Sequence, residues 1–184
     1  NVKTCEKHGA GAVVLKSLYE EQILADLDRL IEQDDMFQWY PEAMDFVNTI
    51  AKDEGIHSYL DLIKDLKAHT SIPIIASINC ITTQEWPKFA NELQVAGADA
   101  LELNISIFPE NAETESLTLE DQYISIVKAV KEQVQIPISV KLSTYFTNMR
   151  RMVTRLADHG VSGVVLFNRY YRPDIDIDTL KMVT

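Results

Sequence analysis

Short apolar runs alternate along this chain with longer segments in which apolar residues recur at helical spacing. The runs are rich in β-branched residues and are bounded by Gly, Pro or polar residues, as buried strands usually are. They predict strands over Ala12–Ser17, Ile72–Asn79, Ala100–Ile105, Ile136–Ser143 and Gly163–Asn168. Strands that alternate with helices in this order indicate βα units on a parallel sheet.

Amphipathic periodicity in the intervals predicts the helices. They are expected at Asn1–His8, Tyr19–Gln33, Ser58–His69, from a Thr82/Glu85 capping box to Gly97, and from Thr118 to about Gln133. A last helix carries Met149, Met152 and Leu156 and ends at Gly160. Glycine ends several of them, because a residue in the left-handed conformation closes a helix. Asp34–Asn48 interrupts the pattern as an aromatic, loop-like insertion.

The arrangement repeats after 64 residues, which indicates an internal duplication. Residues paired at this spacing are Pro73 with Pro137, Ser77 with Lys141, and Asn104 with Asn168. An open doubly wound sheet and a (β/α)8 TIM barrel both fit the pattern, and the lack of a Gly-rich dinucleotide fingerprint favours the barrel. A complete barrel has eight strands and typically about 250 residues. We therefore expect one α/β domain over residues 1–184, an incomplete TIM barrel of about five βα units with strands missing at both ends.

Composition and net charge restrict the kinds of molecule that the protein is expected to bind. A net charge of −11 argues against nucleic acid and anionic membranes, and no apolar run reaches membrane-spanning length. The 46% hydrophobic content is enough for a sizeable core. Cys5 and Cys80 are the two cysteines, which predicts no disulfide framework, no metal site and a cytoplasmic location.

Each predicted strand ends on a polar residue that offers hydrogen bonds or charge. These residues are Lys16, Asn79, Asn104, Lys141 and Asn168. Side chains alternate along a strand, so Ser77 shares a face with Asn79, Glu102 with Asn104, and Ser139 with Lys141. Strand carboxyl ends meet at the mouth of a barrel, where active sites lie. Charged groups inside a barrel need partners, so we expect Lys16, Lys141 and Glu102 to pair with each other or with a polar ligand.

Two ligand classes suit such a ring. Asparagine amides match the edges of heterocycles, and lysine suits a phosphate or a developing anion, so a planar phosphorylated cofactor fits. A carbonyl substrate that forms a Schiff base with Lys141 or Lys16, as in aldolase-type barrels, fits as well. At this point both remain open.

The ordered set of motifs resembles the dihydroorotate dehydrogenases. The matching segments are Lys16-Ser17, Asn104-Ile105-Ser106, Ile138–Leu142 around Lys141, and Asn168 after Val164–Phe167. The resemblance implies an FMN-dependent oxidoreductase of pyrimidine biosynthesis that acts on a CH–CH group. Hydride would pass between a small dihydropyrimidine-like substrate and flavin N5. It assigns cofactor binding to Lys16, Ser17, Asn79, Asn104, Lys141 and Asn168, catalysis to Lys141, and substrate binding to Asn104 and Asn168.

One loop departs from the family pattern. Ile107 stands where the family has a Cys or Ser base, and Phe108 follows it; neither side chain takes a proton. Glu110 and Cys80 are candidates to replace this base. The departure leaves the substrate open and adds a third hypothesis, a barrel that binds flavin or a metabolite without turnover. Expected partners are a small-molecule substrate and, as the family allows, a second copy in a homodimer.

Overall fold

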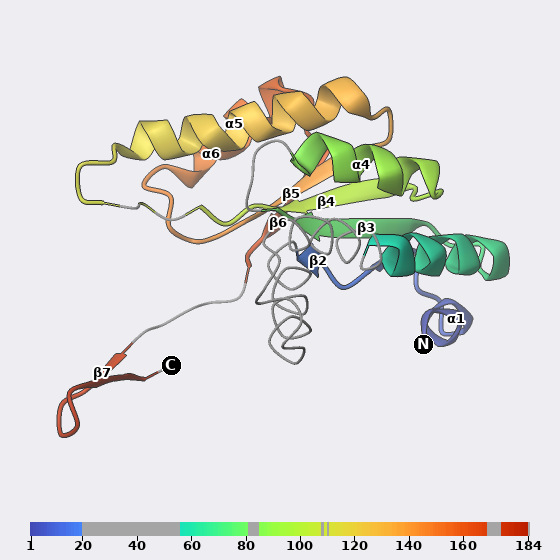
Figure 1. Cartoon of the computed structure of the whole chain (residues 1–184), viewed down its shortest axis with the longest axis horizontal. Helices are drawn as coiled ribbons and strands as arrows, with labels where there is room; N and C mark the ends of the chain where they lie inside the picture. Colours follow the sequence, from blue (N-terminus) through green and yellow to red (C-terminus); the bar gives the residue numbers. More distant parts are fainter. Residues whose placement is uncertain (20–55, 81–84, 108, 110, 169–173, 184) are drawn as a thin grey trace, which may run out of the picture.

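A parallel sheet forms the centre of the computed structural model, which describes residues 1–19, 56–80, 85–107, 109, 111–168 and 174–183. The strand order is β1-β3-β4-β5-β6, and β2 also pairs with β3. The strands are β1 Val13–Val14, β2 Leu18–Tyr19, β3 Ile74–Asn79, β4 Ala100–Asn104, β5 Ile138–Leu142 and β6 Gly163–Leu166. The sheet curls into a half-barrel with helices between successive strands (Figure 1), so the prediction of an incomplete α/β barrel is confirmed.

Helices cover the outer face of this half-barrel. They are a helix over 56–69, α4 Glu85–Val95, α5 Ser116–Gln133 and α6 Met149–Asp158, whereas α1 Val2–Lys7 precedes β1 and has no buried residue. The core lies between them and the sheet. Its fully buried strand residues occupy alternate positions: Ile74, Ala76, Ile78, Leu101, Leu103, Ile138, Val140 and Leu142. Burying this apolar face supplies most of the driving force for folding.

The opposite, concave face of the sheet carries the polar residues. Among the described residues, the buried polar or charged side chains are Ser77, Glu102 and Asn104. All three lie on strands whose other alternate positions are apolar and buried. The alternation therefore separates a packing face from a polar face, as the sequence predicts.

The first predicted strand is wrong in one respect. Instead of one strand over Ala12–Ser17, the chain forms β1, which pairs with the start of β3, and β2, which pairs with its end. Tyr19, expected to open a helix, is the last residue of β2; the rest of that predicted helix and the Asp34–Asn48 insertion lie outside the described residues. The physical reason for the break is a side chain from another element, described below.

Two helices end just before the glycines that were predicted to stop them, whereas α5 begins earlier than predicted. Gly97 and Gly160 follow α4 and α6 with φ of 104° and 83°, in the left-handed region. Glu115, not Thr118, is the N-cap residue of α5, so Thr118 lies within the first turn. Thr82 of the predicted capping box lies outside the described residues, and α4 begins at Glu85.

The chain also forms a hairpin that the sequence analysis missed. Strands β7 (Asp174–Asp176) and β8 (Lys181–Val183) pair antiparallel, and Leu180 in the turn has φ of 52°. The alternating Asp and Ile residues before the turn were the available signal.

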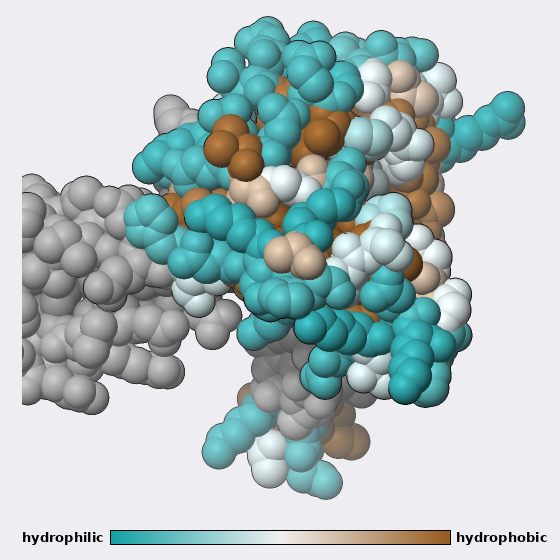
Figure 2. Space-filling view, turned by 90° about the vertical axis from the view of Figure 1, so that its right-hand side faces the viewer, coloured by the Kyte–Doolittle hydropathy of each residue, from teal (hydrophilic) through white to brown (hydrophobic). Residues whose placement is uncertain are grey.

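The strands begin at the end of the molecule that faces the viewer in Figure 2, where hydrophilic side chains predominate. An ion pair ties the elements together here: Lys67 Nζ lies 2.7 Å from Asp99 Oδ2, which also accepts a 2.7 Å hydrogen bond from the Ile74 amide. In the described part of the chain, no helix combines the length and apolarity needed to cross a membrane.

Candidate functional site

Glu102 is the centre of a polar cluster at the carboxyl ends of the strands. Its side chain points to the concave face, and the residue is only 3% exposed. Lys141 Nζ lies 2.7 Å from Glu102 Oε1, and the Ser77 hydroxyl donates a 2.9 Å hydrogen bond to the same oxygen. The predicted pairing of Lys141 with Glu102 is therefore present. An ion pair and a hydrogen bond together offset the desolvation of this carboxylate.

The cluster continues from Ser77 to residues at β2 and just after β6. The Ser77 and Ser17 hydroxyls are 2.6 Å apart. Asn104 Nδ2 donates to the Tyr19 hydroxyl at 3.2 Å and to Ser17 Oγ at 3.4 Å. The Asn168 amide donates to Asn104 Oδ1 at 2.8 Å. We call this connected set the polar cluster; its members are Ser17, Tyr19, Ser77, Glu102, Asn104, Lys141 and Asn168.

Tyr59, from the helix over 56–69, supports the cluster from behind and explains the break between β1 and β2. Its hydroxyl accepts a hydrogen bond from the Ser77 amide at 3.2 Å and donates one to the Ser77 carbonyl at 3.3 Å. These are the backbone groups that an unbroken neighbouring strand would pair. Burial raises the pKa of Tyr59 to about 12, the Ser77 backbone opposes this shift and the Glu102 charge adds to it. The phenol therefore stays neutral.

The predicted site residues fall into two groups. Ser17, Asn104, Lys141 and Asn168 join the polar cluster. Asn79 is half-buried at the end of β3, in register with Tyr19, whereas Lys16 is exposed. Sequence reasoning missed Tyr19 and Tyr59. Tyr59 carried a signal, because it precedes the buried Ile63 and Leu66 on the same face of its helix.

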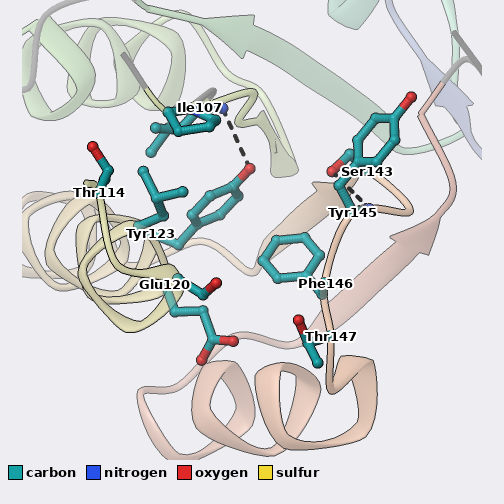
Figure 3. A pocket seen from close by; sticks show the side chains of 11 residues that line it. Ile107, Thr114, Glu120, Tyr123, Ser143, Tyr145, Phe146 and Thr147 are labelled. Atoms are coloured by element: carbon teal, nitrogen blue, oxygen red, sulfur yellow. Dashed lines mark hydrogen bonds between the residues drawn. The ribbon is translucent and has the colours of Figure 1, made fainter. Parts of the chain in front are cut away.

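A separate pocket of about 560 Å³ lies beyond the ends of β4 and β5 (Figure 3). Its lining residues are Ile107, Pro109, Thr114, Ser116, Leu119, Glu120, Tyr123, Ser143, Tyr145, Phe146 and Thr147. The Tyr123 ring meets Phe146 edge-on, with ring centroids 5.3 Å apart. Glu120, the charged residue in this lining, is paired with Arg155 at 3.0 Å. The pocket therefore suits an uncharged, mainly apolar group.

Ile107 belongs to this pocket. Its amide donates to the Tyr123 hydroxyl at 3.4 Å, and the hydroxyl in turn donates to the Ile105 carbonyl at 3.4 Å. Burial raises the pKa of Tyr123, and its contact with the Ile107 amide opposes the shift. The loop after β4 is thus held through its backbone, and residue 107 contributes an apolar contact.

Cys80 and Glu110 are the candidates to replace the proton-accepting residue of the family pattern, and the structure describes one of them. Cys80 follows β3, is 8% exposed and belongs to the hydrophobic core, which matches a packing role. Glu110 and Phe108 lie outside the described residues. Of these candidates, the structure describes only Cys80, which lies in the hydrophobic core.

A family model and curated relatives of this chain point to the same protein family. The family model described as dihydroorotate dehydrogenase matches residues 36–184. The catalytic subunit of dihydroorotate dehydrogenase B (NAD(+)) from Methanocella arvoryzae is 30% identical over 97% of this chain and 56% of its own length. The corresponding subunit from Methanocaldococcus jannaschii is 28% identical over 99% of this chain and 58% of its own length. The chain thus spans a little over half the length of these two relatives.

A solved structure assigned to a dihydrodipicolinate synthetase from Pseudomonas aeruginosa covers 58% of this chain and 37% of its own. Its sequence identity is 21% and its TM-score is 0.45, values too low to support any conclusion about function. The family match, in contrast, covers more than half of the chain. The chain belongs to the dihydroorotate dehydrogenase family.

Proposed function

We propose that the protein is an FMN-dependent oxidoreductase that acts on a CH–CH group, with hydride passing between a small dihydropyrimidine-like substrate and flavin N5. The polar cluster carries this proposal. It presents a lysine, paired at 2.7 Å with a buried carboxylate, and two linked asparagines at the mouth of the half-barrel. Family membership supports the same class of reaction.

The donor set of the concave face fits a flavin ring. The ring edge offers carbonyl and nitrogen acceptors and one N–H donor, which ammonium and amide groups complement. The Lys141 side chain is 23% exposed, so its ammonium remains accessible while Glu102 holds it. Lys141, Ser17, Asn104 and Asn168 would hold the cofactor, with Asn79 and Lys16 at the periphery. FMN, when bound, supplies the capacity to take up and release two electrons.

The residues of the cluster have distinct roles in this proposal. Lys141 provides a fixed positive charge for the ring edge on which negative charge develops. Asn104 and Asn168 orient the polar edge of the substrate. The hydrogen bond from Asn168 to Asn104 fixes these groups before the substrate arrives, and preorganised dipoles of this kind lower the barrier. Ile107 offers no proton acceptor, so dihydroorotate itself is not assigned as substrate.

The Schiff-base hypothesis is less compatible with this geometry. A lysine attacks a carbonyl as the neutral amine, usually in a desolvated or cationic environment. Lys141 instead lies in an ion pair with the buried Glu102 carboxylate, and Lys16 is exposed. Binding without turnover remains the second candidate, because Ile107 replaces the base of the family pattern.

The absorbance spectrum of the full-length protein as purified tests the proposal. We expect visible flavin absorbance, and we expect Lys141→Ala to weaken FMN binding by about tenfold or more, the scale of one charged contact. Lys64→Ala is the control, since Lys64 pairs with Asp61 on an exposed helix surface. A colourless protein that does not respond to added FMN would refute the proposal. Bound flavin that stays oxidised with every dihydropyrimidine would favour binding without turnover.

A further inference from the structure

We propose that Glu102 is a positioning residue that balances the charge of Lys141 and thereby lowers the reduction potential of the cofactor. The inference rests on the proposed function and concerns how the site would control it. No proton transfer is assigned to Glu102. Its effect would act through the ammonium with which it is paired.

The geometry places the two charges in a fixed order. Glu102 is buried beneath the concave face, and Lys141, its partner at 2.7 Å, is the more exposed of the two. A ligand at the mouth therefore meets the ammonium first and the carboxylate behind it. The combined field of such a pair decreases with distance faster than that of a lone lysine, and burial limits screening by water.

The Ser77 hydroxyl fixes this order. It donates to the same carboxylate oxygen that contacts Lys141, and Tyr59 holds the backbone of Ser77 from the helix side. Glu102 therefore has little freedom to turn away when a ligand approaches. Glu120 and Arg155, outside the polar cluster, form a comparable ion pair at 3.0 Å, which provides a matched control.

Charge balance matters because flavin reduction changes the charge of the ring. Two electrons and one proton enter together as a hydride equivalent, so a ring that was neutral gains one negative charge. A lone lysine would strongly favour that anionic form. With Glu102 behind it, Lys141 still orients the ring but favours the reduced form less, which makes it easier to pass the electrons on.

The midpoint potential of FMN bound to the full-length protein tests this directly. We expect Glu102→Gln, which keeps the size of the side chain and an acceptor for Ser77, to raise the ratio of reduced to oxidised flavin about tenfold at a given potential. That ratio corresponds to a positive shift of about 30 mV for a two-electron couple. Lys141→Met should shift the potential in the negative direction, and Glu120→Gln should leave it unchanged.

The Glu102→Gln/Lys141→Met double variant removes both charges and is measured in parallel, in case Glu102→Gln alone fails to fold. Its potential should lie above that of Lys141→Met. A purely structural Glu102 would alter stability and leave the potentials unchanged. If the variants bind FMN at wild-type potential, or if Glu102→Gln lowers it, the inference is wrong while the proposed function stands. A full-length protein that binds no FMN overturns both.

Discussion

The side-chain amide of Asn168 donates a 2.8 Å hydrogen bond to Asn104 Oδ1, although the two residues are 64 positions apart in the sequence. The same spacing separates Ser77 from Lys141, and both of these bind Glu102 Oε1. Equivalent positions of the internal repeat thus meet in one hydrogen-bonded network. Because β4 lies next to both β3 and β5, Glu102 on β4 contacts residues of both repeats.

Replacing Lys141 with Met should destabilise the full-length protein by about 3 kcal/mol, because it leaves the buried Glu102 carboxylate without its counter-ion. Urea denaturation measures the free energy of unfolding. Lys64→Met is the control: Lys64 and its partner Asp61 are both exposed, so we expect the free energy of unfolding to change little. Adding Glu102→Leu to Lys141→Met should restore part of the loss. An unchanged midpoint for Lys141→Met would contradict the ion pair.

Replacing Tyr59 with Phe should cost about 2 kcal/mol, because the buried Ser77 amide and carbonyl lose their partner. Tyr145→Phe, at a position 62% exposed, should change stability little. The raised pKa of Tyr59 also predicts a pH effect. Its contribution to stability is complete below the ordinary value of 10.0 and is lost as the pH rises through about 12. Ultraviolet titration of the wild type against Tyr59→Phe measures that late ionisation; an ordinary titration would exclude the buried hydroxyl.

Asp99 should stabilise the fold in a pH-dependent way. Burial pushes the pKa of Asp99 up, but the hydrogen bonds from Lys67 and the Ile74 amide hold it below its ordinary value of 3.8. The contribution is therefore complete above about pH 4 and is lost as the pH falls through the lowered value. Asp99→Asn should cost about 1 kcal/mol at pH 7, a figure discounted because the side chain is 36% exposed.

Thermal unfolding at pH 7 and at pH 3 tests the Asp99 prediction. The difference between Asp99→Asn and wild type should shrink at the lower pH. Asp61→Asn is the control, because Asp61 pairs with Lys64 on an exposed surface and its loss should leave the melting temperature unchanged. A difference that stays constant with pH would show that Asp99 acts through packing instead of charge.

Replacing Gly97 with Ala should destabilise the protein by about 1–2 kcal/mol, because φ of 104° is unfavourable for a residue with a Cβ. Space is not the problem: the new Cβ would meet only Lys67 Cγ, at 3.5 Å. Gly11→Ala is the matched control, since nothing lies within 4 Å of its Cβ position and its φ is ordinary. Equal melting temperatures for the two variants would contradict the strain.

The sequence was sufficient for the parts of the fold that follow from periodicity. Alternation along β4 and β5 places Glu102 and Lys141 on one face, and their contact follows because neighbouring parallel strands align at their carboxyl ends. The glycines that close α4 and α6 were recognisable because helix termination is a local property.

Features that depend on distant partners could not be read in this way. The break between β1 and β2 depends on Tyr59, whose hydroxyl takes the place of a strand at Ser77. Lys16 and Ser17 are adjacent, so their motif cannot tell which of them faces the cluster; in the structure Ser17 does and Lys16 is exposed. Such choices are made by tertiary contacts.

The separation of the two faces of the sheet has an evolutionary consequence. Side chains such as Ile138 and Val140 maintain the fold, and their neighbour Ser139 can change with little effect on the core, so new ligands can be accommodated by single substitutions on the concave face. Glu102 and Lys141 are the exception. Because losing Lys141 leaves the buried Glu102 carboxylate without its counter-ion, a lineage that loses the lysine is expected to replace Glu102 as well.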